Sequence, residues 1–137
     1  MRNADPVAIL TAMALRCLIV DDNTGFLRSA RLLLEREGIE VVAVASTGDE
    51  ARRLSEALRP DVILVDVDLG PESGFEVAGR LRERTAGAAA PDVILISLHA
   101  EEDLADLIAA SPASGFIAKP LLSAPAIREL LGRSRGR

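Results

Sequence analysis

Five short apolar runs, each followed by a longer amphipathic stretch, constrain the fold of this chain more than any other feature. The runs are CLIV at 17–20, VVAVA at 41–45, VILV at 62–65, VILIS at 93–97 and GFIAK at 115–119. Runs that are apolar on both faces are typical of strands in a parallel sheet that helices cover on each side. The alternation therefore predicts an α/β fold, (βα)5, doubly wound around a parallel five-stranded sheet.

The amphipathic stretches carry the start and stop signals of helices. Gly38 follows the first stretch as a stop signal. Four start signals are of three kinds. Thr47 with Glu50 and Ser73 with Glu76 are possible capping boxes, Glu101–Asp103 form an acidic first turn, and Ser123 with Pro125 is a serine followed by an early proline. Each predicted strand is thus followed by one predicted helix. The stretch TAGAAAP at 85–91 is predicted to be a loop.

Length and charge limit the number of domains and the class of partner. A chain of 137 residues suits one domain, which we place at 15–131, between a flexible leader at 1–14 and a basic tail at 132–137. The net charge of −5 argues against a direct nucleic-acid partner. The apolar segment at 7–15 is too short to span a membrane. The lone Cys17 suits a reducing compartment, so we expect a cytoplasmic protein without a membrane partner.

Polar residues end four of the five predicted strands. They are Asp21 and Asp22 after the first, Asp66 after the third, Ser97 at the end of the fourth and Lys119 at the end of the fifth. Parallel sheets bind ligands at the carboxyl ends of their strands, so these side chains are expected to converge. Three carboxylates held together repel one another unless a cation neutralises them, which favours Mg²⁺, with Mn²⁺ as a substitute ion.

Each of these residues has a simpler interpretation when it is taken alone. Asp22 or Asn23 would more often be a helix N-cap than a ligand. Lys119 suits a solvated strand end, Ser97 a cap, and Phe116 core packing. The complete set is what favours a functional site over these readings.

Four segments in this order resemble the receiver domains of response regulators. They are VDDN at 20–23, PDVILVD at 60–66, the fourth strand ending in serine, and GFIAKP at 115–120. The resemblance implies a flavodoxin-like sheet with strand order 2-1-3-4-5. It also implies a two-component or phosphorelay phosphoprotein that takes a phosphoryl group onto Asp66 from a sensor histidine kinase or a histidine phosphotransfer protein. Such a domain catalyses its own phosphorylation and slow autodephosphorylation and is not a conventional enzyme.

The resemblance also implies a role for each site residue. Asp22 and Asp66 would ligate Mg²⁺ directly, Asp21 mainly through water, and Asp68 through its main-chain carbonyl. Lys119 would lie against the phosphoryl oxygens.

A second group of residues would transmit the phosphorylation. Ser97 would donate its hydroxyl to the phosphoryl group, and Phe116 would swing inward as that hydroxyl moves. The Lys119–Pro120 peptide bond is cis in family members, and Gly74 keeps the family register before the third helix. The face made by the fourth helix, the fifth strand and the fifth helix would then switch and bind a downstream protein, or pair with a second copy.

Two positions depart from the family pattern. Gly70 stands where receiver domains usually carry proline, and Pro71 follows it. Leu98 stands where a small residue is usual, so we expect it to cover part of the pocket. His99, the one histidine, lies in the same loop and is read as an ordinary loop residue.

Two alternative functions stay open at this point. A pseudo-receiver would bind partners without being phosphorylated, although the complete set of acids, serine and lysine argues against it. A haloacid-dehalogenase-type phosphatase would use Asp66 and Asp68 as its DxD pair, but that motif should end a first strand and here follows the third.

Overall fold

The computed structural model describes residues 14–83 and 90–135. The predicted leader at 1–14 therefore lies outside the described residues except for its last position. The predicted loop at 85–91 is described only from residue 90 onward.

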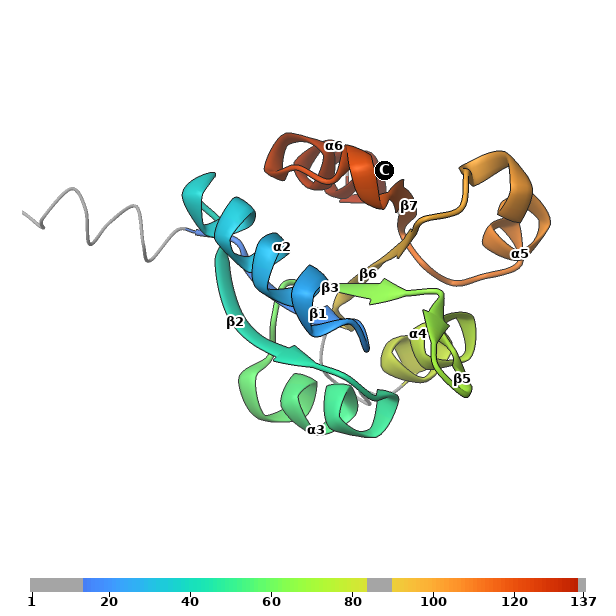
Figure 1. Cartoon of the computed structure of the whole chain (residues 1–137), viewed down its shortest axis with the longest axis horizontal. Helices are drawn as coiled ribbons and strands as arrows, with labels where there is room; N and C mark the ends of the chain where they lie inside the picture. The colour runs from blue at the N-terminus through green and yellow to red at the C-terminus, as the bar shows by residue number, and fades with distance from the viewer. Residues whose placement is uncertain (1–13, 84–89, 136–137) are drawn as a thin grey trace, which may run out of the picture.

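Five parallel strands form the central sheet (Figure 1). They are β1 (Arg16–Val20), β2 (Glu40–Ala45), β3 (Val62–Asp66), β6 (Asp92–Ser97) and β7 (Gly115–Ala118). The order β2-β1-β3-β6-β7 is the predicted order 2-1-3-4-5 of the five parallel strands, so the fold prediction is confirmed. All five predicted apolar runs are strands, with bounds that differ by one residue at most.

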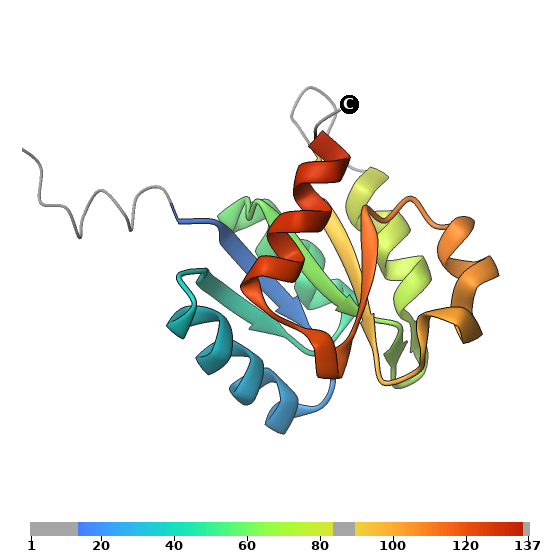
Figure 2. The same ribbon diagram turned by 90° about the horizontal axis from the view of Figure 1, so that it is seen from above.

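Helices cover both faces of this sheet (Figure 2). On one face lie α2 (Thr24–Arg36) and α6 (Ala124–Arg135), and on the other lie α3 (Gly48–Leu58), α4 (Gly74–Glu83) and α5 (Ala105–Ala109). Successive residues of β1 point to opposite faces, so Cys17 and Ile19 join the first core cluster and Leu18 and Val20 the second. Burial on both sides is why the strand sequences are apolar throughout.

The helix signals in the sequence act as predicted at several positions. The Thr47 hydroxyl accepts a hydrogen bond from the Glu50 N–H at 3.1 Å, and the Glu50 carboxylate accepts one from the Ser46 N–H at 2.9 Å. The Ser123 hydroxyl accepts one from the Ala126 N–H at 3.1 Å. Gly38, with a φ of 92°, follows α2 in the left-handed region that glycine tolerates.

The third helix is confirmed, since α4 begins at Gly74 and buries Val77, Ala78 and Leu81, whereas the fourth differs from the prediction. Ser73 directly precedes α4 but also ends a short hairpin, in which β4 (Asp68–Leu69) pairs antiparallel with β5 (Glu72–Ser73). The fourth helix is reduced to a 3₁₀ turn, η1 (Glu101–Leu104), followed by the five residues of α5. So short a helix cannot turn all its apolar residues inward, and Leu107 is 54% exposed.

Two further expectations near the C-terminus are corrected. The predicted tail at 132–137 begins within α6, which continues to Arg135. The Lys119–Pro120 peptide bond is not cis. Instead, Lys119–Leu121 form a 3₁₀ turn, η2, in which the Leu122 N–H donates to the Lys119 carbonyl at 3.1 Å, and the fixed φ of proline suits such a helical turn. Across residues 14–83 and 90–135, no helix is both long enough and apolar enough to cross a bilayer.

Candidate functional site

The register of the sheet determines which strand ends meet. Val20 of β1 lies beside Val65 of β3, so the residues that follow them, Asp21 and Asp66, leave the sheet side by side. Ser97 of β6 lies beside Ala118 of β7, which brings Lys119 to the same edge. These side chains come from distant parts of the sequence and meet because parallel strands end at one edge.

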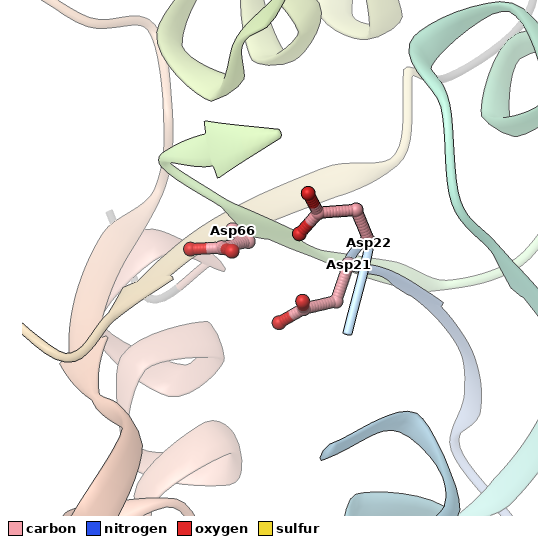
Figure 3. Close-up of side chains that lie close together, drawn as sticks. All are labelled: Asp21, Asp22 and Asp66. Atoms are coloured by element: carbon pink, nitrogen blue, oxygen red, sulfur yellow. The ribbon is translucent and has the colours of Figure 1, made fainter. Parts of the chain in front are cut away.

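Three carboxylates form a cluster at this edge (Figure 3). Oxygens of Asp21, Asp22 and Asp66 all lie within 4.8 Å of one another. Asp21 and Asp66 are buried, whereas Asp22 is exposed. The cluster therefore has a buried base and an open side, which a hydrated cation or a phosphoryl donor could approach.

Lys119 supplies positive charge to the cluster. Its Nζ lies 2.7 Å from Asp21 Oδ2 and 3.5 Å from Asp66 Oδ2, and its side chain is only 10% exposed. The same Nζ lies 4.3 Å from the centroid of the Phe26 ring, at the start of α2, where a cation is attracted to the aromatic face. Lys119 is therefore not a solvated strand end. Helical periodicity in the sequence does not reveal this contact of Phe26 with a distant lysine.

The ionisation of Asp66 reflects its surroundings. Burial, reinforced by the neighbouring Asp21 carboxylate, raises the pKa of Asp66 from 3.8 to about 6. A hydrogen bond from the Asp68 N–H at 3.3 Å and the charge of Lys119 act in the opposite direction but do not cancel the rise. One lysine thus leaves the three carboxylates incompletely neutralised.

The two carboxylate oxygens of Asp21 differ in their hydrogen bonding. Its Oδ1 accepts a hydrogen bond from the Asn23 N–H at 2.8 Å. Its Oδ2 is fully buried and has no hydrogen-bond partner of acceptable direction, although Lys119 Nζ is only 2.7 Å away. We interpret the Lys119 contact as an ion pair, because the distance is short and both groups are charged. The set of three hard carboxylate ligands fits a divalent cation such as Mg²⁺.

The loop after β6 and the start of β4 form the exposed rim of the site. His99 Nε2 in that loop lies 3.5 Å from Asp68 Oδ2 in β4, with side chains 60% and 72% exposed. The Asp68 carboxylate is thus directed to the rim. Leu98 is 77% exposed. The sequence did not reveal the contact between His99 and Asp68, because the two residues lie in separate segments of the chain.

Ser97 and Phe116, the predicted switch residues, are both buried. The Ser97 hydroxyl accepts a hydrogen bond from the His99 N–H at 3.0 Å. Phe116 is 7% exposed and belongs to the core cluster beneath α3 and α4. The Phe116 side chain is therefore already buried, whereas the resemblance implied that it turns inward only after phosphorylation.

Gly74 holds the backbone of the site in place. A Cβ at this position would lie 1.9 Å from the Asp66 carbonyl oxygen, far inside any contact that real side chains make. The Gly74 N–H donates to the Val67 carbonyl at 2.8 Å. Only glycine lets α4 begin so close to the end of β3. Gly70, with a φ of 60°, makes the turn between β4 and β5, which explains why glycine suits this departure from the family pattern.

Comparison with known proteins identifies the family. The sequence model of the response regulator receiver domain matches residues 17–131. The positive alginate biosynthesis regulatory protein of Pseudomonas aeruginosa is 37% identical over 86% of this chain and 46% of its own length. The DNA-binding transcriptional activator EvgA of Escherichia coli is 29% identical over 77% of this chain and 50% of its own. The chain thus spans about half the length of these curated relatives.

Solved structures agree with the sequence comparison. A CheY-like response regulator receiver domain protein from Methanospirillum hungatei superposes with a TM-score of 0.72 and 25% identity, over 90% of this chain and 95% of that one. The signal receiver domain of a modulated diguanylate cyclase from Desulfovibrio desulfuricans gives a TM-score of 0.71 with 29% identity, over 88% and 93%.

Proposed function

Because this chain belongs to the response regulator receiver domains of two-component signalling, we propose that it is a phosphoacceptor that takes a phosphoryl group onto Asp66 with the help of Mg²⁺. The observation that carries the proposal is the cluster of three carboxylates, two of which contact the nearly buried ammonium of Lys119. The donor is a phosphohistidine on a sensor kinase or phosphotransfer protein.

In the proposed reaction an oxygen of Asp66 attacks the phosphorus atom of the donor. The phosphorus–nitrogen bond breaks, its electron pair stays on the imidazole nitrogen, and an aspartyl phosphate forms. Asp66 attacks as the carboxylate, and with a pKa of about 6 it is mostly ionised at neutral pH. Lys119 stabilises the negative charge of the transferring group, and the Ser97 hydroxyl donates to one of its oxygens.

The carboxylates would hold the metal ion. Asp22 and Asp66 would be direct ligands, Asp21 would act through water, and the main-chain carbonyl of Asp68 would add a further oxygen. When bound, the ion supplies positive charge that offsets the charge of the phosphoryl group. The ratio of charges supports this assignment, because three clustered carboxylates face one ammonium and the pKa of Asp66 is raised.

A phosphorylation assay tests the proposal directly. The protein is incubated with acetyl phosphate and Mg²⁺, and intact mass reports the gain of one phosphoryl group. We expect labelling of the wild type, no labelling of Asp66→Asn, and labelling of the matched control Asp68→Asn. The control removes a nearby carboxylate, 72% exposed, but keeps the main-chain carbonyl. Labelling of Asp66→Asn at the wild-type rate would show that another residue accepts the phosphoryl group.

We propose that the output surface is the face of α5, β7 and α6. Phosphate at Asp66 would bias two arrangements of this face through Ser97 and Phe116, which lie on β6 and β7. Amide exchange of the two forms should differ within residues 98–131, and identical protection there would remove the basis for the switch. The phosphatase alternative is not favoured, because the chain belongs to the receiver family and the Asp68 carboxylate faces His99 at the rim.

A further inference from the structure

A hollow on the surface between α5, β7 and α6 has mainly apolar walls. Its volume is about 510 Å³, which is within the range of pockets that bind peptide side chains or small molecules. The apolar lining residues are Ile108, Phe116, Ile117, Leu121, Ala126 and Leu130. We call this hollow the α5–α6 groove. A second hollow of about 580 Å³, on the α5 side, shares Glu101, Glu102 and Ile108 with it, so the recess extends across η1 and α5.

The edge of the groove carries an exposed apolar side chain. Leu121, in η2, is 71% exposed, whereas Phe116 and Ile117 of β7 are 7% and 6% exposed. Large apolar side chains gathered around a hollow are typical of a surface that binds another molecule.

The rim of the α5–α6 groove carries uncompensated negative charge. The charged residues that line it are Glu101, Glu102, Glu129 and Arg133, so three carboxylates face one guanidinium and two negative charges remain. Arg133 already pairs with Glu129 at 3.4 Å. Within the part of the chain that the structure describes, the side chains of Glu101 and Glu102 make no hydrogen bond and no ion pair. Asp103 and Asp106 add further negative charge to the same segment.

We propose that the α5–α6 groove binds a short basic segment of a protein partner, with one large apolar side chain in the groove and flanking Lys or Arg residues beside Glu101 and Glu102. The inference rests on the proposed function, because it assigns a partner chemistry to the output face. The apolar walls supply the anchor site, and the acidic rim selects the sign of the flanking charges.

The same charges argue against a second copy of this chain as the occupant. A two-fold pairing through this face would bring the two acidic rims together, and the chain as a whole carries a net charge of −5. Like charges across an interface disfavour association.

Selection from a random peptide display library against the full chain tests the chemistry without assuming a sequence. We expect the enriched peptides to carry net positive charge and a Leu, Ile, Met or aromatic residue. Their affinity should fall as the salt concentration rises, because the rim charges are exposed and therefore screened. Enrichment of acidic or purely polar peptides would overturn the proposal.

Matched variants test whether the selected peptide binds in the α5–α6 groove. Glu101→Lys should weaken the selected peptide about tenfold, whereas Glu40→Lys, an exposed site on β2 at the opposite edge of the sheet, should change affinity less than about twofold. Leu121→Ala should likewise weaken binding more than Leu32→Ala, a leucine on α2 that is 58% exposed. Equal effects of the groove and control variants would overturn the proposal, as would a dimer that Leu121→Ala dissociates.

The assay separates this inference from the proposed phosphorylation. Peptide binding is measured without a phosphodonor, on the wild type and on Asp66→Asn. If labelling fails but basic peptides still bind in the groove, the inference stands and the phosphoacceptor proposal fails. If Asp66 is labelled but the selected peptides are acidic or bind elsewhere, the reverse holds.

Discussion

Replacement of Asp66 by asparagine should stabilise the metal-free protein at neutral pH, although it removes the proposed phosphorylation site. The pKa of this carboxyl is raised from 3.8 to about 6, first by burial and then by the Asp21 carboxylate. The folded state therefore binds the Asp66 proton more tightly than the unfolded state does. The contribution of this group to stability is largest below about pH 4 and is lost as the pH rises through about 6.

The size of the effect follows from the shift in pKa. A rise from 3.8 to about 6 is about 2 units, and each unit corresponds to about 1.4 kcal/mol, which gives about 3 kcal/mol as an upper limit. Asparagine is neutral at every pH, so it avoids this penalty. The shift already includes the attraction to Lys119, whose Nζ lies 3.5 Å from Asp66 Oδ2. We therefore expect a net gain of about 1–3 kcal/mol at about pH 7.5 that shrinks toward zero at about pH 4.

Urea unfolding in the presence of EDTA, at several pH values between about 4 and 7.5, measures the difference between the two proteins. Asp68→Asn serves as the control, because its carboxylate is 72% exposed, and its difference from the wild type should vary little with pH. A gain from Asp66→Asn that is the same at every pH would refute the reasoning, and so would a loss of stability at neutral pH. Addition of Mg²⁺ should stabilise the wild type more than Asp66→Asn, because the variant lacks one of the proposed ligands.

Four further substitutions test the site. Asp22→Ala should remove most of the stabilisation by Mg²⁺ in thermal unfolding, and an unchanged titration would contradict its role as a ligand. Lys119→Ala should slow labelling by acetyl phosphate at least about tenfold, and an unchanged rate would mean that the ammonium does not act on the phosphoryl group. Gly74→Ala should destabilise the fold by more than about 3 kcal/mol in urea unfolding, since its Cβ would meet the Asp66 carbonyl at 1.9 Å, and a small loss would show that α4 shifts easily. Leu98→Ala should speed both labelling and phosphate release, with a stability change within about 1 kcal/mol because the side chain is 77% exposed, and if neither rate rises the leucine does not restrict the pocket.

The candidate site was predictable from the sequence in its membership but not in its geometry. Asp21, Asp66 and Lys119 each follow an apolar strand, and parallel strands end at one edge, so their convergence follows from the fold. The distances do not follow. Lys119 is nearly buried against Asp21 and the Phe26 ring, and this depends on how α2 packs on the sheet.

The resemblance to a known family gave the strand order, and the sequence by itself determined two further features. They are the alternation of strands and helices and the helix caps at Thr47 and Ser123. These features depend on short-range periodicity and on hydrogen bonds between residues that are close in the chain. Only the tertiary structure decided the β4–β5 hairpin, the short α5 with its open groove, the contact of His99 with Asp68 and the close approach that requires Gly74. The physical reason is that these features depend on contacts between separate segments, whose geometry is determined when the whole core packs rather than by any local pattern.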